Sequence, residues 1–354
     1  MKRYLLSTLT LSLLASFAFA AEPTAPISGI DTQFIQPSVR AQDDFFVYLN
    51  GKWLEKTEIP ADKSSWGTFA KLRDDVQPQI RSIIESAQQE KNQKAGSEAR
   101  KIGDLYASYM NEKKRDELGY KPLTGELAKI RGLKDKKAIP ALIAHLSKIG
   151  VATPYTVYIA QDARESTRYA ANIYQSGLGL PDRDYYLKKD DAKMADAKAK
   201  YEQHIAAMLA MVGRKDAAEA AKAIVALETD LAQAQWTKVE NRDPVKQYNK
   251  VPLAKLGELT PGYDWKAAAA AAGVANKVDY VIVNQPSYLT GFNTVLEKTD
   301  LATWKSYFEW HLIHTYANYL SKPFVDTTFA FYGTALTGVT ENRPVWKRAV
   351  STVE

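Results

Sequence analysis

The residues with the clearest chemical potential are two histidines in the stretch EWHLIH, His311 and His314. Their spacing of three residues places both imidazoles on one face of a helix. Such a pair could begin a zinc site, but a third ligand is needed, and a hydrolytic site also needs a general base nearby. Glu309 lies on a different face from His314, and the sequence contains no H-E-x-x-H motif. We therefore favour a structural interpretation, in which the two imidazoles are the polar ends of side chains that pack along an aromatic-rich helix.

A second candidate is the glycine-containing stretch SGLGLPDRDYYL, which begins at Ser176. Gly177 and Gly179 resemble part of a phosphate loop, but no third glycine and no P-loop lysine follow them. Pro181 also interrupts the chain where a phosphate-binding helix would begin. We therefore expect a rigid turn, in which Asp182 and the charged residues after it bind backbone amides and opposite charges.

The stretch SSWGTFAKLRDD places an aromatic ring and a cation near each other, at Trp66 and Arg73. An exposed ring with an arginine could hold the carboxylate of a peptide. Tryptophan is more often part of a core, however, and arginine more often part of a surface ion pair. The residue types alone leave both interpretations open.

Other familiar catalytic arrangements are missing from the sequence. No Ser-His-Asp arrangement and no Gly-x-Ser-x-Gly motif is found. The 354 residues include no cysteine, which excludes disulfides, thiolate metal ligands and thiol chemistry. By their chemistry alone, these residues indicate a domain without a visible catalytic centre.

The N-terminal residues 1–20 are typical of a signal peptide. Lys2 and Arg3 precede an apolar run, and residues 18–20 (Ala-Phe-Ala) fit the cleavage pattern before Ala21. A membrane anchor is the alternative, but the apolar run is short for a bilayer span. We expect a secreted protein, located in a bacterial periplasm.

The charge of the chain excludes one class of partner. The formal net charge is +6, and without residues 1–20 the chain keeps 45 basic against 41 acidic residues, about +4. This excess is small, and the lysines are scattered along helical faces, so we expect no nucleic-acid partner. No later stretch is apolar enough to cross a bilayer, so we expect no stable membrane span after signal cleavage.

Helical periodicity dominates the sequence from residue 42 onward and predicts a mainly α fold, a large multi-helix lobe at 42–354. We expect residues 21–41, rich in Pro, Ser, Thr and Gln, to form an extended lead-in. Within the helix predicted at 215–236, Asp216 and Glu219 have the spacing of a capping box. Apolar residues three and four apart predict helices at 72–89, 98–111, 137–149, 190–212, 215–236, 300–320 and 322–336.

Two stretches have the composition of strands. Residues 153–160 and 168–174 are rich in Val, Ile, Thr and Tyr and are separated by a turn-like segment, which predicts a small antiparallel β element near 153–175. Residues 278–283 could be another strand or the start of a buried helix, because periodicity does not separate these cases. An α+β fold with a small sheet is the alternative to the mainly α fold.

Several longer stretches together resemble the neprilysin family of zinc metallopeptidases. They are aromatic-rich and follow the order and spacing of that family from residue 43 to the last residue. The stretches are DDFFVYLNGKWLEKTEIPADKSSWGTFAKLRDD (43–75), LYASYMNEKKRDELGYKPL (105–123), QSGLGLPDRDYYL (175–187), RDPVKQYNKV (242–251), LTPGYDW (259–265) and FYGTALTGVTENRPVWKRAVSTVE (331–354).

This resemblance implies a helical N-terminal region that, in the family, precedes a thermolysin-like catalytic region. That second region carries the H-E-x-x-H helix, whose zinc polarises the scissile carbonyl and activates a water. The helical region restricts entry to a cavity, so family members cleave oligopeptides. Zinc would be the cofactor of the complete enzyme, and this chain alone would be inactive. Its implied partners are oligopeptide substrates and the missing C-terminal catalytic region.

The resemblance also implies which residues face the substrate. Animal members carry an arginine just before an aromatic–glycine pair, and that arginine contacts the bound peptide. Here Ser65 occupies this position and Trp66 is the aromatic residue. Arg73 matches the arginine of the family's Leu-Arg-Asp and would face the peptide. No catalytic and no metal-binding residue is implied in this chain.

The sequence stops at Glu354 within a helical pattern, without a glycine or proline to end it. We therefore expect a longer parent protein and, on this chain, an apolar patch that the remainder covers. Two alternatives remain. One is a stand-alone helical module that binds peptides or proteins without catalysis, and the other is a metal protein that uses His311 and His314.

Overall fold

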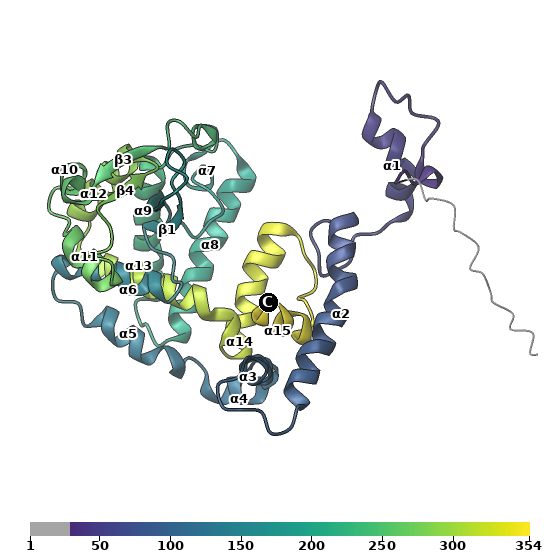
Figure 1. The fold of residues 1–354 in the computed structure, drawn as a ribbon, viewed down its shortest axis with the longest axis horizontal. Helices are drawn as coiled ribbons and strands as arrows, with labels where there is room; N and C mark the ends of the chain where they lie inside the picture. Colours follow the sequence, from purple (N-terminus) through teal and green to yellow (C-terminus); the bar gives the residue numbers. More distant parts are fainter. Residues whose placement is uncertain (1–28) are drawn as a thin grey trace, which may run out of the picture. The chain divides into compact units, whose positions relative to one another are not determined.

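The computed structural model describes residues 29–354, and the expected signal peptide at 1–20 lies outside them (Figure 1). The chain forms two units that meet in the sequence between Ile59 and Pro60. The described part of the first unit contains the 3-10 turn η1 (Thr32–Phe34) and α1 (Phe45–Lys56). Asp44 caps α1, because its carboxylate accepts a hydrogen bond from the amide of Val47 at 2.9 Å.

The second unit, from Pro60 to the C-terminus, is mainly helical, which confirms the predicted fold class. Each of the seven predicted helical ranges overlaps a helix of the structure. The α-helices of this unit are α2 (Thr68–Gln89), α3 (Glu98–Met110), α4 (Glu112–Leu118), α5 (Thr124–Arg131), α6 (Ile139–Lys148), α7 (Asp184–Leu187), α8 (Ala192–Met211), α9 (Ala217–Ala234), α10 (Leu256–Leu259), α11 (Trp265–Ala272), α12 (Pro286–Lys298), α13 (Leu301–Tyr316), α14 (Lys322–Thr328) and α15 (Val345–Val353).

One small mixed sheet accompanies these helices, with strand order β1-β2-β4-β3. β1 (Tyr155–Gln161) and β2 (Tyr169–Gln175) are antiparallel, which confirms the predicted pair. The segment at 278–283 contains β4 (Tyr280–Val283), which runs parallel to β2. β3 (Asn249–Pro252) pairs with β4 and was not predicted, because four residues are too few to show an alternating pattern.

The larger hydrophobic core lies between one face of the sheet and the surrounding helices. Its centre is α13, in which Trp304, Tyr307 and Phe308 are fully buried. A helix that is covered on nearly all sides needs apolar residues all round, so α13 lacks the single apolar stripe of a surface helix. None of the helices in residues 29–354 is both long and apolar enough to cross a membrane.

A second, smaller core brings the C-terminal helix α15 against α2 and α3 (Figure 1). Ile84 of α2 and Tyr106 of α3 pack there with Ala349 and Val350 of α15. At its edge the guanidinium of Arg81 lies 4.9 Å from the centre of the indole ring of residue 346. Segments separated by more than 200 residues therefore stabilise each other.

One local expectation was wrong. The side chain of Asp216 does not cap α9; it pairs with the guanidinium of Arg214, with a nitrogen–oxygen distance of 2.8 Å. The helix predicted at 322–336 is present, as α14 followed without a break by a π-helical segment, η7 (Phe329–Ala335). The phenyl ring of Phe329 lies against Gly333, where a Cβ atom would approach the ring to 2.5 Å. A charge partner thus overrides the capping pattern at Asp216.

The buried face of α2 can be tested with two neighbouring isoleucines. Ile84 is 3% exposed and Ile83 is 68% exposed. We expect Ile84→Ala to lower the free energy of unfolding by about 2–5 kcal/mol, because it leaves a cavity in the smaller core. Ile83→Ala should change it by less than about 0.5 kcal/mol. Urea denaturation followed by circular dichroism measures both, and equal effects would show that the assigned face is wrong.

Candidate functional site

The residues that the family resemblance singles out lie on the loop before α2 and on its first turns. Ser65 is exposed on this loop. Trp66 is partly buried, and the ammonium of Lys63 lies 5.7 Å from its ring centre. Arg73 is exposed on α2, and its guanidinium has no hydrogen bond or ion pair within residues 29–354. The structure therefore leaves the charge of Arg73 available to an anionic group.

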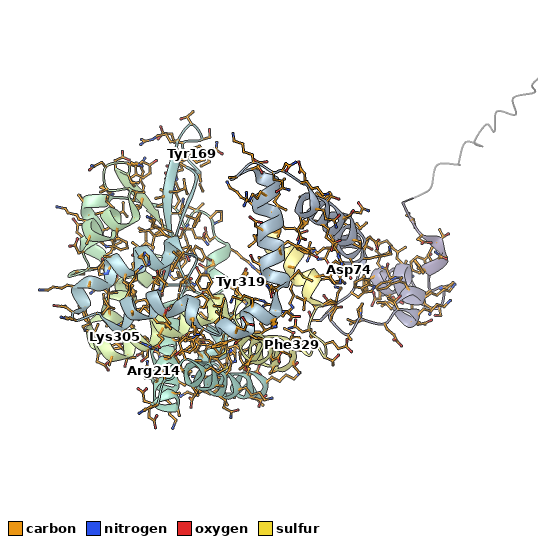
Figure 2. All side chains as sticks on the ribbon, turned by 90° about the horizontal axis from the view of Figure 1, so that it is seen from below. Asp74, Tyr169, Arg214, Lys305, Tyr319 and Phe329 are labelled. Atoms are coloured by element: carbon orange, nitrogen blue, oxygen red, sulfur yellow. The ribbon has the colours of Figure 1, made fainter. Side chains whose placement is uncertain are left out.

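A group of four charged side chains holds this loop in place. Lys63 lies 2.9 Å and Lys347 of α15 lies 3.1 Å from the carboxylate of Asp74, and Asp62 completes the group. Burial opposes the ionisation of Asp74, but hydrogen bonds from the two lysines outweigh it, so the pKa of Asp74 lies below its usual range. Figure 2 shows Asp74 at this junction. The loop is thus fastened to the C-terminal helix.

The side of α2 that does not face the smaller core is also apolar. Phe69 is 85% exposed, Leu72 is 53% exposed and Ile83 is 68% exposed, with Val76 between them. Phe69, Leu72 and Val76 are spaced by three and then four residues, which places them on one helical face beside Arg73. We call Phe69, Leu72, Arg73, Val76 and Ile83 the α2 surface. An exposed apolar row of this kind is typical of an interaction site.

The glycine-containing stretch forms the expected rigid turn. The carboxylate of Asp182 accepts a hydrogen bond from the amide of Asp184 at 2.6 Å and lies 2.6 Å from the ammonium of Lys238. Gly177 has a φ of +87°, and a Cβ atom on Gly179 would lie 1.7 Å from the hydroxyl of a packed tyrosine. Gly177 is therefore required because the backbone bends there with a positive φ. Gly179 is required because a tyrosine hydroxyl packs directly against its backbone.

A buried carboxylate, Glu228 of α9, lies beneath this turn. It is fully buried and accepts hydrogen bonds from the hydroxyls of Tyr186 at 2.6 Å and Tyr201 at 3.1 Å. Burial, together with the charge of Glu228, raises the pKa of both tyrosines well above the usual range, so both phenols keep their protons. The imidazole Nε2 of His311 lies 2.9 Å from the same carboxylate.

The two histidines that could begin a zinc site have separate surroundings. His311 is engaged by Glu228, whereas the ring of His314 packs against Tyr332 with a centroid distance of 4.7 Å. In the described part of the chain, no three His, Asp or Glu side chains are grouped so as to hold a metal ion. The alternative of a metal protein that uses His311 and His314 therefore finds no third ligand among the described residues. We assign no metal-dependent step to them.

A third histidine, His204 of α8, shares this region. It is 5% exposed, and its ring stacks on Phe331 with a centroid distance of 5.0 Å and an interplanar angle of 14°. Neither ring nitrogen has a hydrogen-bond partner among residues 29–354. Burial disfavours the imidazolium and lowers the pKa of His204 to about 4. This histidine is neutral at neutral pH.

Comparison with known proteins identifies the family. A family model described as peptidase family M13 matches residues 41–354. The chain belongs to peptidase family M13. The match covers the second unit and α1, so the neprilysin-like resemblance of the separate sequence stretches is confirmed over nearly the whole described chain.

The curated relatives include animal enzymes. The chain is 29% identical over 338 residues to endothelin-converting enzyme 1 of Rattus norvegicus, which covers 90% of this chain and 43% of that enzyme. It is 28% identical over 336 residues to neprilysin-11 of Caenorhabditis elegans, covering 88% of this chain and 39% of the relative. The chain thus spans less than half the length of these curated M13 relatives.

Solved structures of bacterial proteins show the same fold. The zinc metalloprotease ZMP1 of Mycobacterium tuberculosis, solved with an inhibitor, aligns with a TM-score of 0.87 and 39% identity over 92% of this chain and 50% of that chain. PEPO of Lactobacillus rhamnosis aligns with a TM-score of 0.72 at 22% identity, covering 89% of this chain and 49% of that one. The second likeness concerns the M13 fold alone.

Sequence reasoning located Ser65, Trp66 and Arg73 through the family motif, but it missed the α2 surface and the Glu228 group. The apolar row on α2 was visible as periodicity, yet nothing in the sequence indicated which side would be covered. The partners of Glu228 come from three helices and a turn, so no spacing rule connects them.

The neutral, buried His204 predicts a pH dependence of stability. Its pKa is about 4 in the folded chain against the usual 6.5, so between these values the unfolded chain binds more protons. The contribution of His204 to the free energy of unfolding is therefore fully present above pH 6.5. It falls as the pH is lowered, by up to about 1.4 kcal/mol per pH unit. We expect His204→Phe to make the decline between pH 6.5 and 4.5 shallower, as measured by urea denaturation. An unchanged slope would contradict this assignment.

Proposed function

We propose that this chain is the N-terminal helical lobe of a secreted M13 zinc endopeptidase that hydrolyses oligopeptides. In this proposal the lobe forms one wall of the substrate chamber and packs against a C-terminal catalytic region. The observation that carries the proposal is the α2 surface, which combines exposed apolar side chains with the unpaired cation of Arg73 on one helix.

The apolar part of the α2 surface supports the packing role. Phe69, Leu72 and Ile83 together expose large side chains on a helix whose other side is already buried. Leaving such a row in water is unfavourable, so a covering partner is expected. The curated relatives, which are more than twice as long as the matched segment, have additional chain that could supply that partner.

The polar part supports contact with substrate. An exposed guanidinium without an internal partner can form two parallel hydrogen bonds to the carboxylate of a peptide. Arg73 has this property, and Trp66 offers a ring nearby, held by the fastened loop. Ser65, where animal members carry an arginine, offers only a hydroxyl. We therefore propose Arg73 as the main carboxylate contact, with Ser65 and Trp66 as neighbours in the substrate-binding wall.

Residues outside this chain would supply the zinc and the general base of the complete enzyme. Zinc bound there would polarise the scissile carbonyl and activate a water. This chain would contribute binding, orientation and exclusion of large substrates. Export follows from the signal-like residues 1–20, and a bacterial periplasm is the proposed location. N-terminal sequencing of the exported protein should give Ala21 as the first residue.

The alternative is a stand-alone helical module that binds peptides or proteins without catalysis. The exposed α2 surface also fits that function, so the reading frame beyond codon 354 discriminates between them. A continuing frame that encodes H-E-x-x-H supports the enzyme lobe. A stop codon directly after codon 354 refutes the enzyme lobe and supports the binding module.

The role of Arg73 can be tested in the complete enzyme. We expect Arg73→Ala to raise the KM for peptides with a free C-terminal carboxylate about tenfold, because the bidentate contact is lost, and to change kcat less. Peptides with an amidated C-terminus should show little change in KM. Arg73→Lys should be intermediate, since an ammonium lacks the guanidinium fork.

Arg100→Ala is the matched control for charge, because Arg100 lies on α3, where its guanidinium is 3.5 Å from the carboxylate of Asp104. This variant should behave like the wild type. Equal changes in KM for the free and amidated peptides in Arg73→Ala would refute the carboxylate contact.

A further inference from the structure

The β1 strand forms an open edge of the sheet. It pairs with β2 on one side only, because the strand order is β1-β2-β4-β3. Just outside the two ends of β1, the amide of Ser176 donates to the carbonyl of Pro154 at 3.0 Å, and the amide of Asp162 donates to the carbonyl of Arg168 at 2.9 Å. Hydrogen-bonded pairs alternate in an antiparallel ladder, so the even-numbered residues of β1 face β2.

The odd-numbered residues of β1 therefore direct their amides and carbonyls away from the sheet. For Val157 and Ile159, no hydrogen bond to a group outside the β1–β2 ladder is formed within the described residues. Their side chains are also 47% and 61% exposed. Natural edge strands usually carry a lysine, a proline or a bulge against unwanted pairing, and the sequence YTVYIAQ of β1 has no charge and no proline.

An apolar pocket of about 360 Å³ adjoins this edge, on the face to which Val157 and Ile159 point. Its other walls come from α6 and α11, which pack against each other over the sheet. Trp265 and Ala268 of α11 and Ile143 of α6 are among the lining residues. A space of this size and polarity accommodates a large apolar side chain.

One cation stands among the residues that line the pocket. Lys148, at the end of α6, is exposed, and its ammonium has no hydrogen bond or ion pair in the part of the chain described by the structure. A free backbone edge, an apolar pocket and a cation thus occur together. These are the elements by which an exposed strand recognises an added strand and its alternate side chains.

We propose that β1 binds an extended peptide segment as an added strand, with one large apolar side chain in the pocket and a carboxylate near Lys148. The backbone groups of Val157 and Ile159 would provide the main-chain hydrogen bonds. This site is separate from the α2 surface and does not depend on catalysis. It would act as a docking site for a peptide on the helical lobe.

A second copy of the chain fits this edge less well. Antiparallel pairing of two identical β1 strands requires a two-fold axis perpendicular to the sheet, which keeps the same face of both sheets on the same side. Both Lys148 side chains would then lie on that shared face and add like charge. A peptide carboxylate instead neutralises the one cation that is present, so a peptide is the favoured occupant.

Fluorescence anisotropy with the full chain tests this proposal. The probe is a labelled hexapeptide of alternating Thr and Val with one central Phe and a free C-terminal carboxylate. Its control is the same peptide methylated on alternate backbone nitrogens, which keeps the side chains but blocks strand pairing. We expect saturable binding of the first peptide and at least about tenfold weaker binding of the second, because the main-chain hydrogen bonds carry the affinity.

Two substitutions on one strand separate the pocket face from the opposite face. Ile159→Lys places a charge at the pocket and should weaken binding about tenfold or more, because that charge would have to be desolvated. Tyr158→Lys is the matched control, since Tyr158 is 41% exposed and points to the other face of the sheet. Lys148→Glu should weaken binding of the hexapeptide with a free C-terminal carboxylate, but not binding of the same hexapeptide with an amidated C-terminus. Unchanged thermal denaturation verifies that each variant is folded.

Each remaining outcome also decides the matter. Equal binding of the methylated and unmethylated peptides, or equal effects of Ile159→Lys and Tyr158→Lys, would overturn the added strand. Absence of peptide binding would also overturn it, and self-association that Ile159→Lys abolishes would then indicate a second copy as the occupant. Loss of the Arg73 effect in the complete enzyme would leave this site unaffected, so the two proposals fail separately.

Discussion

The buried carboxylate of Glu228 is the interaction on which much of the larger core depends. A charge without water must be surrounded by donors, and here they come from separate parts of the chain. Tyr186 of α7, Tyr201 of α8 and His311 of α13 lie around it, and the amide of Gly179 approaches it to 3.4 Å. Three helices and the glycine turn are therefore positioned together with α9, which explains why the turn must be rigid.

A second buried carboxylate fixes α13 from another direction. Glu309 is fully buried and accepts hydrogen bonds from the guanidinium groups of Arg131 and Arg214, the latter at 2.7 Å. Figure 2 labels Arg214, together with Lys305 of α13, in this part of the second unit. Removing one partner of such a group would leave a buried charge, which is strongly unfavourable. The central helix is thus placed by charge pairing as well as by apolar packing.

The proposed function rests on the parts of the second unit that its two cores do not cover. The smaller core buries one side of α2 and the larger core buries one face of the sheet, whereas the α2 surface and the open edge of β1 remain exposed. Tyr169, 78% exposed, lies at the outer end of the β1–β2 hairpin (Figure 2). Stable single domains rarely leave such features without a use. These are the two surfaces for which we propose a catalytic region and a peptide as partners.

The sequence by itself determined the long helices, the β1–β2 hairpin, the rigid turn and the family. Each depends on short-range periodicity, turn chemistry or motifs that are continuous in the chain. Tertiary structure decided the rest. His311 contacts Glu228, β3 forms beside β4, and Arg214, which pairs with Asp216 in place of a cap on α9, is also bound by Glu309. These outcomes depend on Glu228, β4 and Glu309, which lie far away in the sequence, so a local pattern does not contain them. The covered side of α2 was decided by α15 for the same reason.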